Sequence, residues 1–285
     1  MIFSHPEWNN SPMDDPFSFA VKLALKSGNL LRTYFNPAGI TASVKQDKTV
    51  VTEADLAADE LITSTIREHY PSDEIISEES ATCLGNADSP TWIIDPLDGT
   101  TNFSLGLSIW GVSIARVVNG FPELGALYFP MINELYAAKH GEGAYLNNKP
   151  ICVRAPDPAQ PMSFFACCSR TFRYYDVSIP YKPRILGSCA YSYCMVGRGS
   201  ALLGFEATPK IWDLAAIWVL VQEAGGTISP FEGHAPFPIA INLDYSMTNY
   251  PTLASATPEL LSMGQTKIHR KSKFAFVIQD KPKNE

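Results

Sequence analysis

The chain has 285 residues, which is enough for one large domain or two halves around a substantial hydrophobic core. Its hydrophobic content of 46% and charged content of 18% are typical of a globular protein and argue against a disordered chain. The net charge of −7 argues against a surface built to grip nucleic acid or an anionic membrane, because both would need a basic field.

The start of the chain lacks the basic and apolar regions of a signal peptide. The longest wholly apolar run, Leu214 to Val221, is too short to cross a bilayer. The six cysteines form no C-x-x-C pair and have no histidine at zinc-ligand spacing, which favours buried free thiols in a reducing compartment. We therefore expect a cytoplasmic protein that binds neither membranes nor nucleic acid.

Two helices and a short strand are predicted in the first eighty residues. Apolar residues at helical spacing predict a helix from Phe17 to Tyr34. Thr52 and Asp55 match a loose capping box, and apolar residues follow at steps of three and four, which predicts a helix from about Ala54 to His69. A short strand over 74–79 ends in paired acids.

An apolar run followed by a carboxylate-rich turn contains the densest chemistry in the chain. Trp92 to Ile94 predicts a buried strand that delivers Asp95 and Asp98 to the edge of a sheet. Pro96 and Gly99 are expected to stop the strand and to permit an unusual turn. The residues after the glycine offer consecutive backbone N–H groups and two hydroxyls, which suit a phosphate, and the carboxylates beside them suit a metal-bound one.

Strands predominate in the middle of the chain. They are predicted at 109–118, 124–129, 134–139 and 144–146, with a turn at Asn147 and Asn148. The Pro-rich segment 155–161 is the expected boundary between an N-terminal α+β half, 15–155, and a C-terminal α/β half, 156–262. The second half contains predicted strands at 163–168, 184–186 and 201–206 and a helix at 190–196, and 263–285 forms a tail.

Residues Ile211 to Gly226 are apolar on nearly every face until a Gly-Gly stop, which predicts a buried helix. Asp213 lies at its entrance, where an unpaired carboxylate would be costly. An N-cap role would satisfy Asp213 by itself. The alternative is that Glu78, Asp95, Asp98 and Asp213 converge from the ends of their elements, and such convergence requires cations.

Six blocks of the sequence carry a resemblance to a known family. They are Val44-Lys45, Val51 to Asp55, Ser77 to Ser80, Asp95 to Phe103, Trp212 to Ala216 and Glu223 to Gly226. In these blocks and in their order the chain resembles the inositol monophosphatase family of Mg²⁺-dependent, lithium-sensitive phosphatases. The resemblance covers roughly residues 15 to 262.

The resemblance implies a site with two or three Mg²⁺ ions. Glu78, Asp95 and the backbone carbonyl of Leu97 would bind the first ion. Asp95, Asp98 and Asp213 would bind the second, and a weaker third ion would lie near Glu78 with mostly water around it. Two metals fit a reaction in which a metal-bound water attacks phosphorus and no covalent phosphoenzyme forms.

The resemblance also implies the catalytic and substrate-binding residues. Thr100 and Asp55 match the pair that helps to position the attacking water, and Glu78 is counted with them as catalytic. The amides of Gly99 and Thr100 would hold the phosphate. The implied substrate contacts are Asp98, Gly99, Thr100, Gly187, Ser188, Ala190, Glu206 and Asp213.

The sequence predicts the substrate less narrowly than it predicts the metal site. Glu206 favours a polyol or sugar phosphate, inositol monophosphate first, unless it is an exposed strand-end acid. Thr101-Asn102 is typical of the inositol branch and not of the nucleotidase branch, but Leu105 to Ser108 departs from the usual His-Gly-x-Pro. Fructose 1,6-bisphosphate, histidinol phosphate and 3'-phosphoadenosine 5'-phosphate therefore stay as alternatives. Lys45 is expected near the site, with a solvated strand lysine as the alternative.

A non-catalytic binding or regulatory protein on the same fold is the alternative from another functional class. The basic tail from Ser262 onward could serve such a role or be a solvated terminus. For the whole chain, 1–285, the resemblance implies a single catalytic domain of mixed α/β (α+β) class, a layered αβαβα sandwich, and a homodimer.

Overall fold

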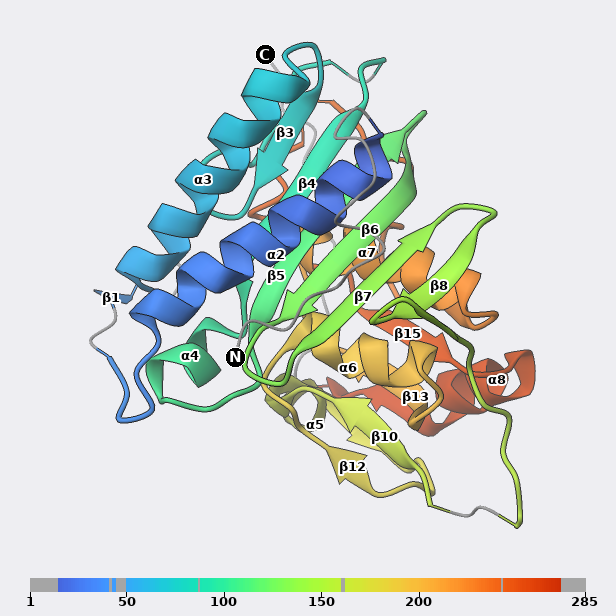
Figure 1. Ribbon diagram of the computed structural model, residues 1–285. Coiled ribbons are helices and arrows are strands. Elements are labelled where there is room, and N and C mark those ends of the chain that lie inside the picture. The colour runs from blue at the N-terminus through green and yellow to red at the C-terminus, as the bar shows by residue number, and fades with distance from the viewer. Residues whose placement is uncertain are drawn as a thin grey trace, which may run out of the picture.

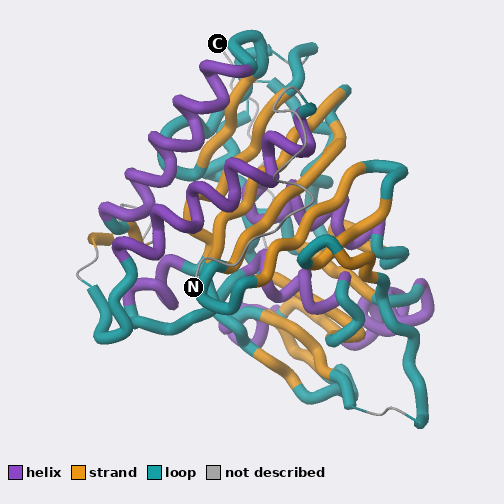
Figure 2. Tube along the Cα trace, viewed as in Figure 1, coloured by secondary structure: helices purple, strands orange, loops and turns teal. Residues whose placement is uncertain are grey.

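Two β-sheets alternate with three layers of helices (Figures 1 and 2). The computed structural model describes residues 15–40, 43–44, 50–86, 88–159, 162–241 and 243–272. The larger sheet is built from sequence before the Pro-rich segment and the smaller one from sequence after it. Within the described residues, no helix is both long and apolar enough to cross a membrane.

The larger sheet has seven strands in chain order. They are β3 (Glu74–Ser77), β4 (Thr91–Asp98), β5 (Gly111–Val118), β6 (Phe121–Phe129), β7 (Glu134–Lys139), β8 (Gly143–Leu146) and β9 (Lys149–Ile151). Only β3 and β4 pair in parallel, and the other neighbours are antiparallel. Asn147 and Asn148 both have positive φ, as the predicted hairpin turn between β8 and β9 requires.

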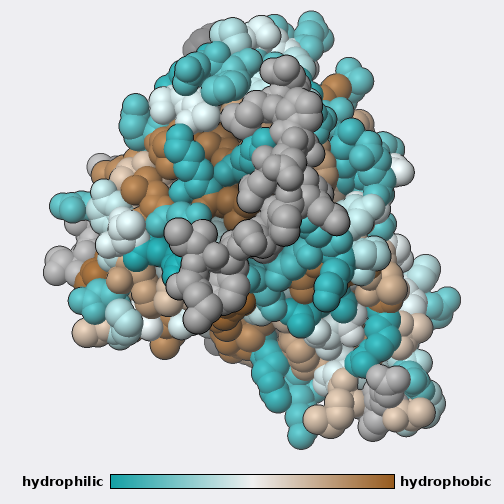
Figure 3. Space-filling model, in the orientation of Figure 1, coloured by the Kyte–Doolittle hydropathy of each residue, from teal (hydrophilic) through white to brown (hydrophobic). Residues whose placement is uncertain are grey.

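Helices α2 (Pro16–Tyr34) and α3 (Glu53–His69) cover one face of this sheet, side by side (Figure 1). Asp15 caps the first helix, and the predicted capping box of Thr52 and Asp55 begins the second. Their apolar stripes pack on Trp92 and Ile94 of β4. Figure 3 shows this side of the molecule, on which hydrophilic and apolar side chains are interspersed.

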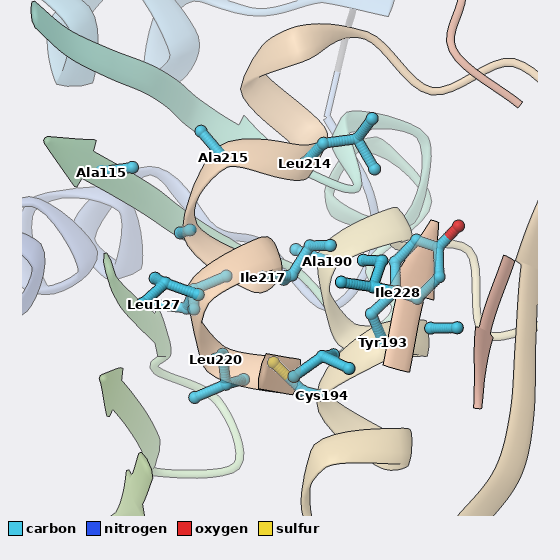
Figure 4. Close-up of a cluster of buried hydrophobic side chains, with 14 of the residues drawn as sticks. Ala115, Leu127, Ala190, Tyr193, Cys194, Leu214, Ala215, Ile217, Leu220 and Ile228 are labelled. Carbon is cyan, nitrogen blue, oxygen red and sulfur yellow. The ribbon is translucent and has the colours of Figure 1, made fainter. Parts of the chain in front are cut away.

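Helices α6 (Cys189–Gly197) and α7 (Ile211–Glu223) form the middle layer between the sheets. Side chains of α7 meet the larger sheet on one side and α6 on the other, which explains why this helix is apolar on nearly every face (Figure 4). The backbones of α7 and the larger sheet approach closely at Gly125 of β6, where a Cβ atom would lie 2.7 Å from the Cα of Ala216.

The smaller sheet has five strands. Their spatial order is β12 (Pro183–Arg184), β10 (Phe164–Cys167), β13 (Ala201–Glu206), β15 (Thr252–Ser255) and β14 (Thr227–Pro230). Helices α5 (Ser169–Tyr174) and α8 (Pro258–Lys267) pack on the side away from the middle layer and complete the αβαβα order that the resemblance implies. Two small ladders pair β1 (Ser43–Val44) with β2 (Val50–Val51) and β11 (Tyr175–Val177) with β16 (Ile268–Arg270).

Several expectations differ from the structure. The strand predicted at 184–186 is the shorter β12, and α5, α8, β14 and β15 were not predicted. Cys83 and Cys152 are exposed, so not every thiol is buried. The described part of the predicted tail, residues 263–272, is not simply solvated, because Arg270 of β16 donates to Glu232 at 2.6 Å and stacks on Tyr175 at 4.9 Å from the ring centroid.

Candidate active site

The bulge in β4 decides where the two aspartates of the turn point. Asp95 pairs with Ser113 and Asp98 with Gly111, so three steps along β4 oppose two along β5. In a regular strand, residues three apart face opposite sides of the sheet, but one extra residue brings both carboxylates to the same side. That side carries α6 and α7, whereas Leu97 belongs to the apolar cluster that α2 and α3 form with the opposite face of the sheet.

The predicted strand stop at Pro96 is therefore wrong. β4 continues to Asp98, and the register shift lies between Asp95 and Asp98. Proline cannot donate a ladder hydrogen bond, and a bulge is one of the few places within a sheet where this loss is tolerated. The proline marks the bulge instead of ending the strand.

Asp98 is bound to the first turn of α6, ninety residues further along the chain. Its Oδ1 accepts the N–H of Cys189 at 3.0 Å, and its Oδ2 accepts the N–H of Ala190 at 3.2 Å and the hydroxyl of Ser188. Burial raises the pKa of Asp98 to about 6 even though these donors favour its charged form. Two of the predicted substrate-side residues, Ser188 and Ala190, thus hold this carboxylate in place.

Asp213 reaches the same point from α7, but it is not the N-cap of that helix. Lys210 is the N-cap, and Asp213 at the third helical position accepts the Lys210 N–H through Oδ2 at 2.6 Å. Burial and the nearby charge of Asp98 raise the pKa of Asp213 to about 7. This hydrogen bond uses only Oδ2 of Asp213, so Oδ1 is available to a ligand.

Asp95, Asp98 and Asp213 form one cluster, in which carboxylate oxygens lie within 4.8 Å of one another. Glu78 follows β3 directly, beside Asp95, because Ser77 is in register with Ile94. Burial raises the pKa of Asp95 well above its usual value, and repulsion from Glu78, Asp98 and Asp213 raises it further. Oxygen donors at this density suit a hard divalent cation, which relieves the repulsion.

A second pair, Asp55 and Thr100, lies beside the cluster. Asp55 is buried and accepts the N–H and hydroxyl of Thr52 through Oδ2, at 2.8 and 2.6 Å. Its Oδ1 lies 3.1 Å from the hydroxyl of Thr100, which is also 3.0 Å from the carbonyl oxygen of Leu97. One carboxylate therefore caps α3 and fixes the threonine next to the acids.

The turn after β4 has the unusual backbone that the sequence predicts. Gly99 has φ +89° and is the N-cap of the short helix α4 (Thr100–Ser104). A Cβ atom here would lie 3.1 Å from the carbonyl oxygen of Ile109 and 3.4 Å from that of Gly187. The first N–H groups of α4 have no intrahelical carbonyl and can donate to a ligand.

Asn102 holds this turn against the Gly187 loop. Its amide nitrogen donates to the carbonyl oxygens of Ile109 at 2.7 Å and Leu186 at 2.8 Å. A Cβ atom on Gly187 would lie only 2.4 Å from the Asn102 side chain. The sequence indicated Asn102 only as a residue that distinguishes family branches, because its bond to Leu186, 84 residues away, leaves no local signal.

Glu206 ends β13 in a buried position, so its reading as an exposed acid is wrong. It is 5% exposed, and burial raises its pKa to about 8. The neighbouring side chains of Cys168 and Ser192 lower this pKa, and the charges of Asp213 and Asp98 raise it. Glu206 is thus part of the acid site, with polar neighbours that the sequence did not indicate.

One predicted site residue cannot be placed, and two charged residues near the site were not predicted. Lys45 lies outside the described residues. Lys210 and Arg170 were not predicted, although both charges act on Asp213. Lys210 immediately precedes a buried helix with an acid at its third position, which is a capping signal that could have been found.

The fold has five layers, and the acid cluster lies where β4 of the larger sheet meets α7 of the middle layer. The family and the relatives that match this chain identify it as a phosphomonoesterase of the layered α/β type. A model of the inositol monophosphatase family matches residues 13–269. The chain belongs to this family, whose members act on small phosphorylated substrates and are generally metal-dependent. The predicted family and fold class are confirmed.

Relatives of known name include proteins with different roles. The chain is 37% identical over 232 residues to the Nus factor SuhB of Escherichia coli, covering 78% of this chain and 87% of the relative. It is 34% identical over 230 residues to a fructose-1,6-bisphosphatase/inositol-1-monophosphatase of Thermotoga maritima, with 77% and 86% covered.

Solved structures agree on the fold. An inositol monophosphatase of Thermotoga maritima superposes with a TM-score of 0.70 at 28% identity, covering 87% of this chain and 95% of that one. The extragenic suppressor protein SuhB of Bartonella henselae gives a TM-score of 0.72 at 26% identity, with 86% and 95% covered.

Proposed function

We propose that the chain is a Mg²⁺-dependent phosphatase that hydrolyses a small phosphomonoester of a polyol, inositol monophosphate first, by direct attack of water. The observation that carries this proposal is the cluster of Asp95, Asp98 and Asp213 beside the hydrogen-bonded pair of Asp55 and Thr100. One part of the site suits cations, and the other suits a water molecule that must be oriented.

The residues that would hold Mg²⁺ are Glu78, Asp95, Asp98, Asp213 and the carbonyl oxygen of Leu97. All are hard oxygen donors, and the described contacts leave a lone pair on each of the three clustered carboxylates. Two or three bound ions would lower the pKa of a water molecule and balance the charge of the phosphate oxygens.

Thr100 would orient the attacking water. Its hydroxyl proton is directed to Asp55 or to the Leu97 carbonyl, so its lone pairs are available to accept a hydrogen bond from water. The N–H groups of Gly99 and Thr100 would donate to phosphate oxygens. The close approach of Gly187 to Gly99 keeps this turn in place.

The polyol part of the substrate would lie toward Gly187, Ser188, Ala190 and Glu206. With a pKa of about 8, Glu206 can donate a proton to a hydroxyl oxygen or accept a hydrogen bond from a hydroxyl group. This chemistry favours a hydroxylated leaving group. Fructose 1,6-bisphosphate is the second choice, because the Thermotoga relative carries both activities in its name.

The name of the Escherichia coli relative supports a second candidate function, a non-catalytic binding role. Asp95→Asn separates the two functions. A binding role would persist in a folded Asp95→Asn protein, whereas phosphate release would stop.

A phosphate-release screen tests the proposed function. The substrates are inositol 1-phosphate, fructose 1,6-bisphosphate, histidinol phosphate and 3'-phosphoadenosine 5'-phosphate, each with Mg²⁺ and with added Li⁺. We expect Mg²⁺-dependent, Li⁺-inhibited release that is lost in Asp95→Asn. The proposal would be defeated if no phosphate were released from any of the four substrates, or if a folded Asp95→Asn protein kept full turnover.

A further inference from the structure

The acids of the site come from two parts of the fold and repel one another. Glu78 follows β3 and Asp95 lies in β4 of the larger sheet, whereas Asp213 lies in the first turn of α7. The charges of Glu78 and Asp213 both raise the pKa of Asp95, so the ionised carboxylates repel. This repulsion favours separation of the helix from the sheet, and contacts elsewhere must oppose it.

Residues 243–250 are bonded to the connection between β3 and β4. The N–H of Tyr245 donates to the carbonyl oxygen of Thr82 at 2.9 Å, and Asp244 pairs with Cys83 in an antiparallel bridge. The Tyr245 side chain is buried and belongs to the same apolar cluster as α7. One end of the segment is therefore fixed to the loop that follows β3.

That loop determines the position of Glu78. The preceding residue, Ser77, donates its N–H to the carbonyl oxygen of Ala81 at 2.6 Å and forms an antiparallel bridge with it. Glu78 therefore lies at the start of a closed turn. The residue directly after this turn accepts the hydrogen bond from Tyr245, so the segment and the acid are joined through a few backbone bonds.

The other end of the segment is bonded to the start of α7. Nζ of Lys210 donates to the carbonyl oxygen of Ser246, and the N–H of Tyr250 donates to the carbonyl oxygen of Pro209 at 2.9 Å. The backbone N–H of the same lysine donates to Oδ2 of Asp213 at 2.6 Å. Lys210 therefore contacts both the segment and the carboxylate.

We propose that residues 243–250 form a strap that holds Asp213 opposite Glu78, and that Lys210 is the positioning residue at its α7 end. The inference rests on the proposed function, in which both acids bind Mg²⁺. The strap opposes the repulsion between the acids, so less reorganisation is needed when Mg²⁺ binds. The effect is reciprocal, because bound Mg²⁺ must stabilise the strap by the factor that the strap adds to Mg²⁺ affinity.

Calorimetric titration with Mg²⁺ at pH 8 tests the strap. We expect the Kd for Mg²⁺ to rise about 10-fold in Lys210→Met, whereas Lys210→Arg should recover most of the affinity. Asp244→Ala should also raise the Kd, because Asp244 accepts the N–H and hydroxyl of Ser246 at 2.9 and 2.7 Å. Its matched control is Asp88→Ala, which removes an exposed acid from the same β3–β4 connection and should leave the Kd unchanged.

The direction of the change separates positioning from charge. The charge of Lys210 acts on Asp213, so loss of that charge alone would tighten the binding of a cation. The chosen pH lies above the pKa of Asp213, about 7, which limits competition from protons. Weaker binding by Lys210→Met therefore reports the lost bond to Ser246. Unchanged or tighter binding in Lys210→Met, or equal binding by Asp244→Ala and Asp88→Ala, would overturn the strap.

Amide hydrogen exchange measures the reciprocal effect. Saturating Mg²⁺ should slow exchange of the Tyr245 N–H about 10-fold in the wild type and have little effect on it in Lys210→Met. The same effect of Mg²⁺ in both proteins would overturn the strap.

Failure of the proposed function gives a different result. If the wild type binds Mg²⁺ but releases no phosphate from any ester, the proposed function fails and the two measurements above still decide the strap. If it binds no Mg²⁺, exchange in EDTA decides. The Tyr245 N–H should then exchange about 10-fold faster in Lys210→Met than in the wild type, and equal rates would overturn the strap.

Discussion

The buried acids predict an unusual pH dependence of stability for the metal-free protein. Asp98 is 5% exposed, and its pKa is about 6 in the folded state against a usual 3.8. Between these values the folded protein holds a proton that the unfolded chain releases, so the free energy of unfolding falls as the pH rises. The difference corresponds to about 3 kcal/mol, lost by pH 7.

Asp213 and Glu206 extend this loss of stability to higher pH. The pKa values of Asp213, about 7, and Glu206, about 8, are raised in the same direction, so the loss continues to about pH 8. Mg²⁺ binds only the deprotonated carboxylates, and it should therefore stabilise the protein more as the pH rises. At a concentration one hundred times its Kd, one ion adds about 2.7 kcal/mol.

Urea unfolding at pH 5, 6, 7 and 8, with EDTA or with Mg²⁺, measures both effects. In EDTA, Asp98→Asn should make the fall in stability with pH less steep, because the amide cannot lose a proton, whereas Glu60→Gln on the exposed face of α3 should leave it unchanged. The reasoning is refuted if metal-free stability rises between pH 5 and 7, or if Mg²⁺ adds as much at pH 5 as at pH 8.

Two further changes test the site and the core. Thr100→Val keeps the shape but removes the hydroxyl that orients water, so kcat for phosphate release should fall about 100-fold, while Thr100→Ser stays within about 10-fold of wild type. Unchanged turnover by Thr100→Val would remove the residue from the reaction. Gly125→Ala should cost about 1–3 kcal/mol in urea unfolding, because the new methyl group would meet the backbone of Ala216 at 2.7 Å. Gly197→Ala is its control, since its nearest neighbours are at 3.7 Å, and equal stability of the two variants would contradict the packing argument.

Local patterns predicted much of the scaffold. The helical spacing before Tyr34, the capping box at Thr52 and the apolar run from Ile211 each indicate an element whose bounds agree with the structure to within a few residues. These signals are strong because capping and amphipathic burial depend on residues three or four positions apart. In the C-terminal region α5, β14 and β15 are short, have weak local patterns and were missed. Helix α8 was missed as well, although Thr257 and Pro258 form a helix-start signal.

The position of each acid along its element was also accessible from the sequence. Glu78 after a strand, Asp95 and Asp98 around a turn, and Asp213 near a helix start are all properties of local sequence. Local sequence left the role of Asp213 open between an N-cap and a metal ligand, and only the resemblance favoured the metal site. In the structure Lys210 occupies the N-cap position.

The sequence by itself determined the carboxylates, the glycine turn and the elements that carry them, and the resemblance of its motifs indicated the family. Tertiary structure decided that the acids form one site. The bulge in β4 turns Asp95 and Asp98 to the same face, and Asp98 is held by an α6 terminus ninety residues away. Neither result follows from local spacing, since strand alternation alone would separate the two aspartates on opposite faces of the sheet.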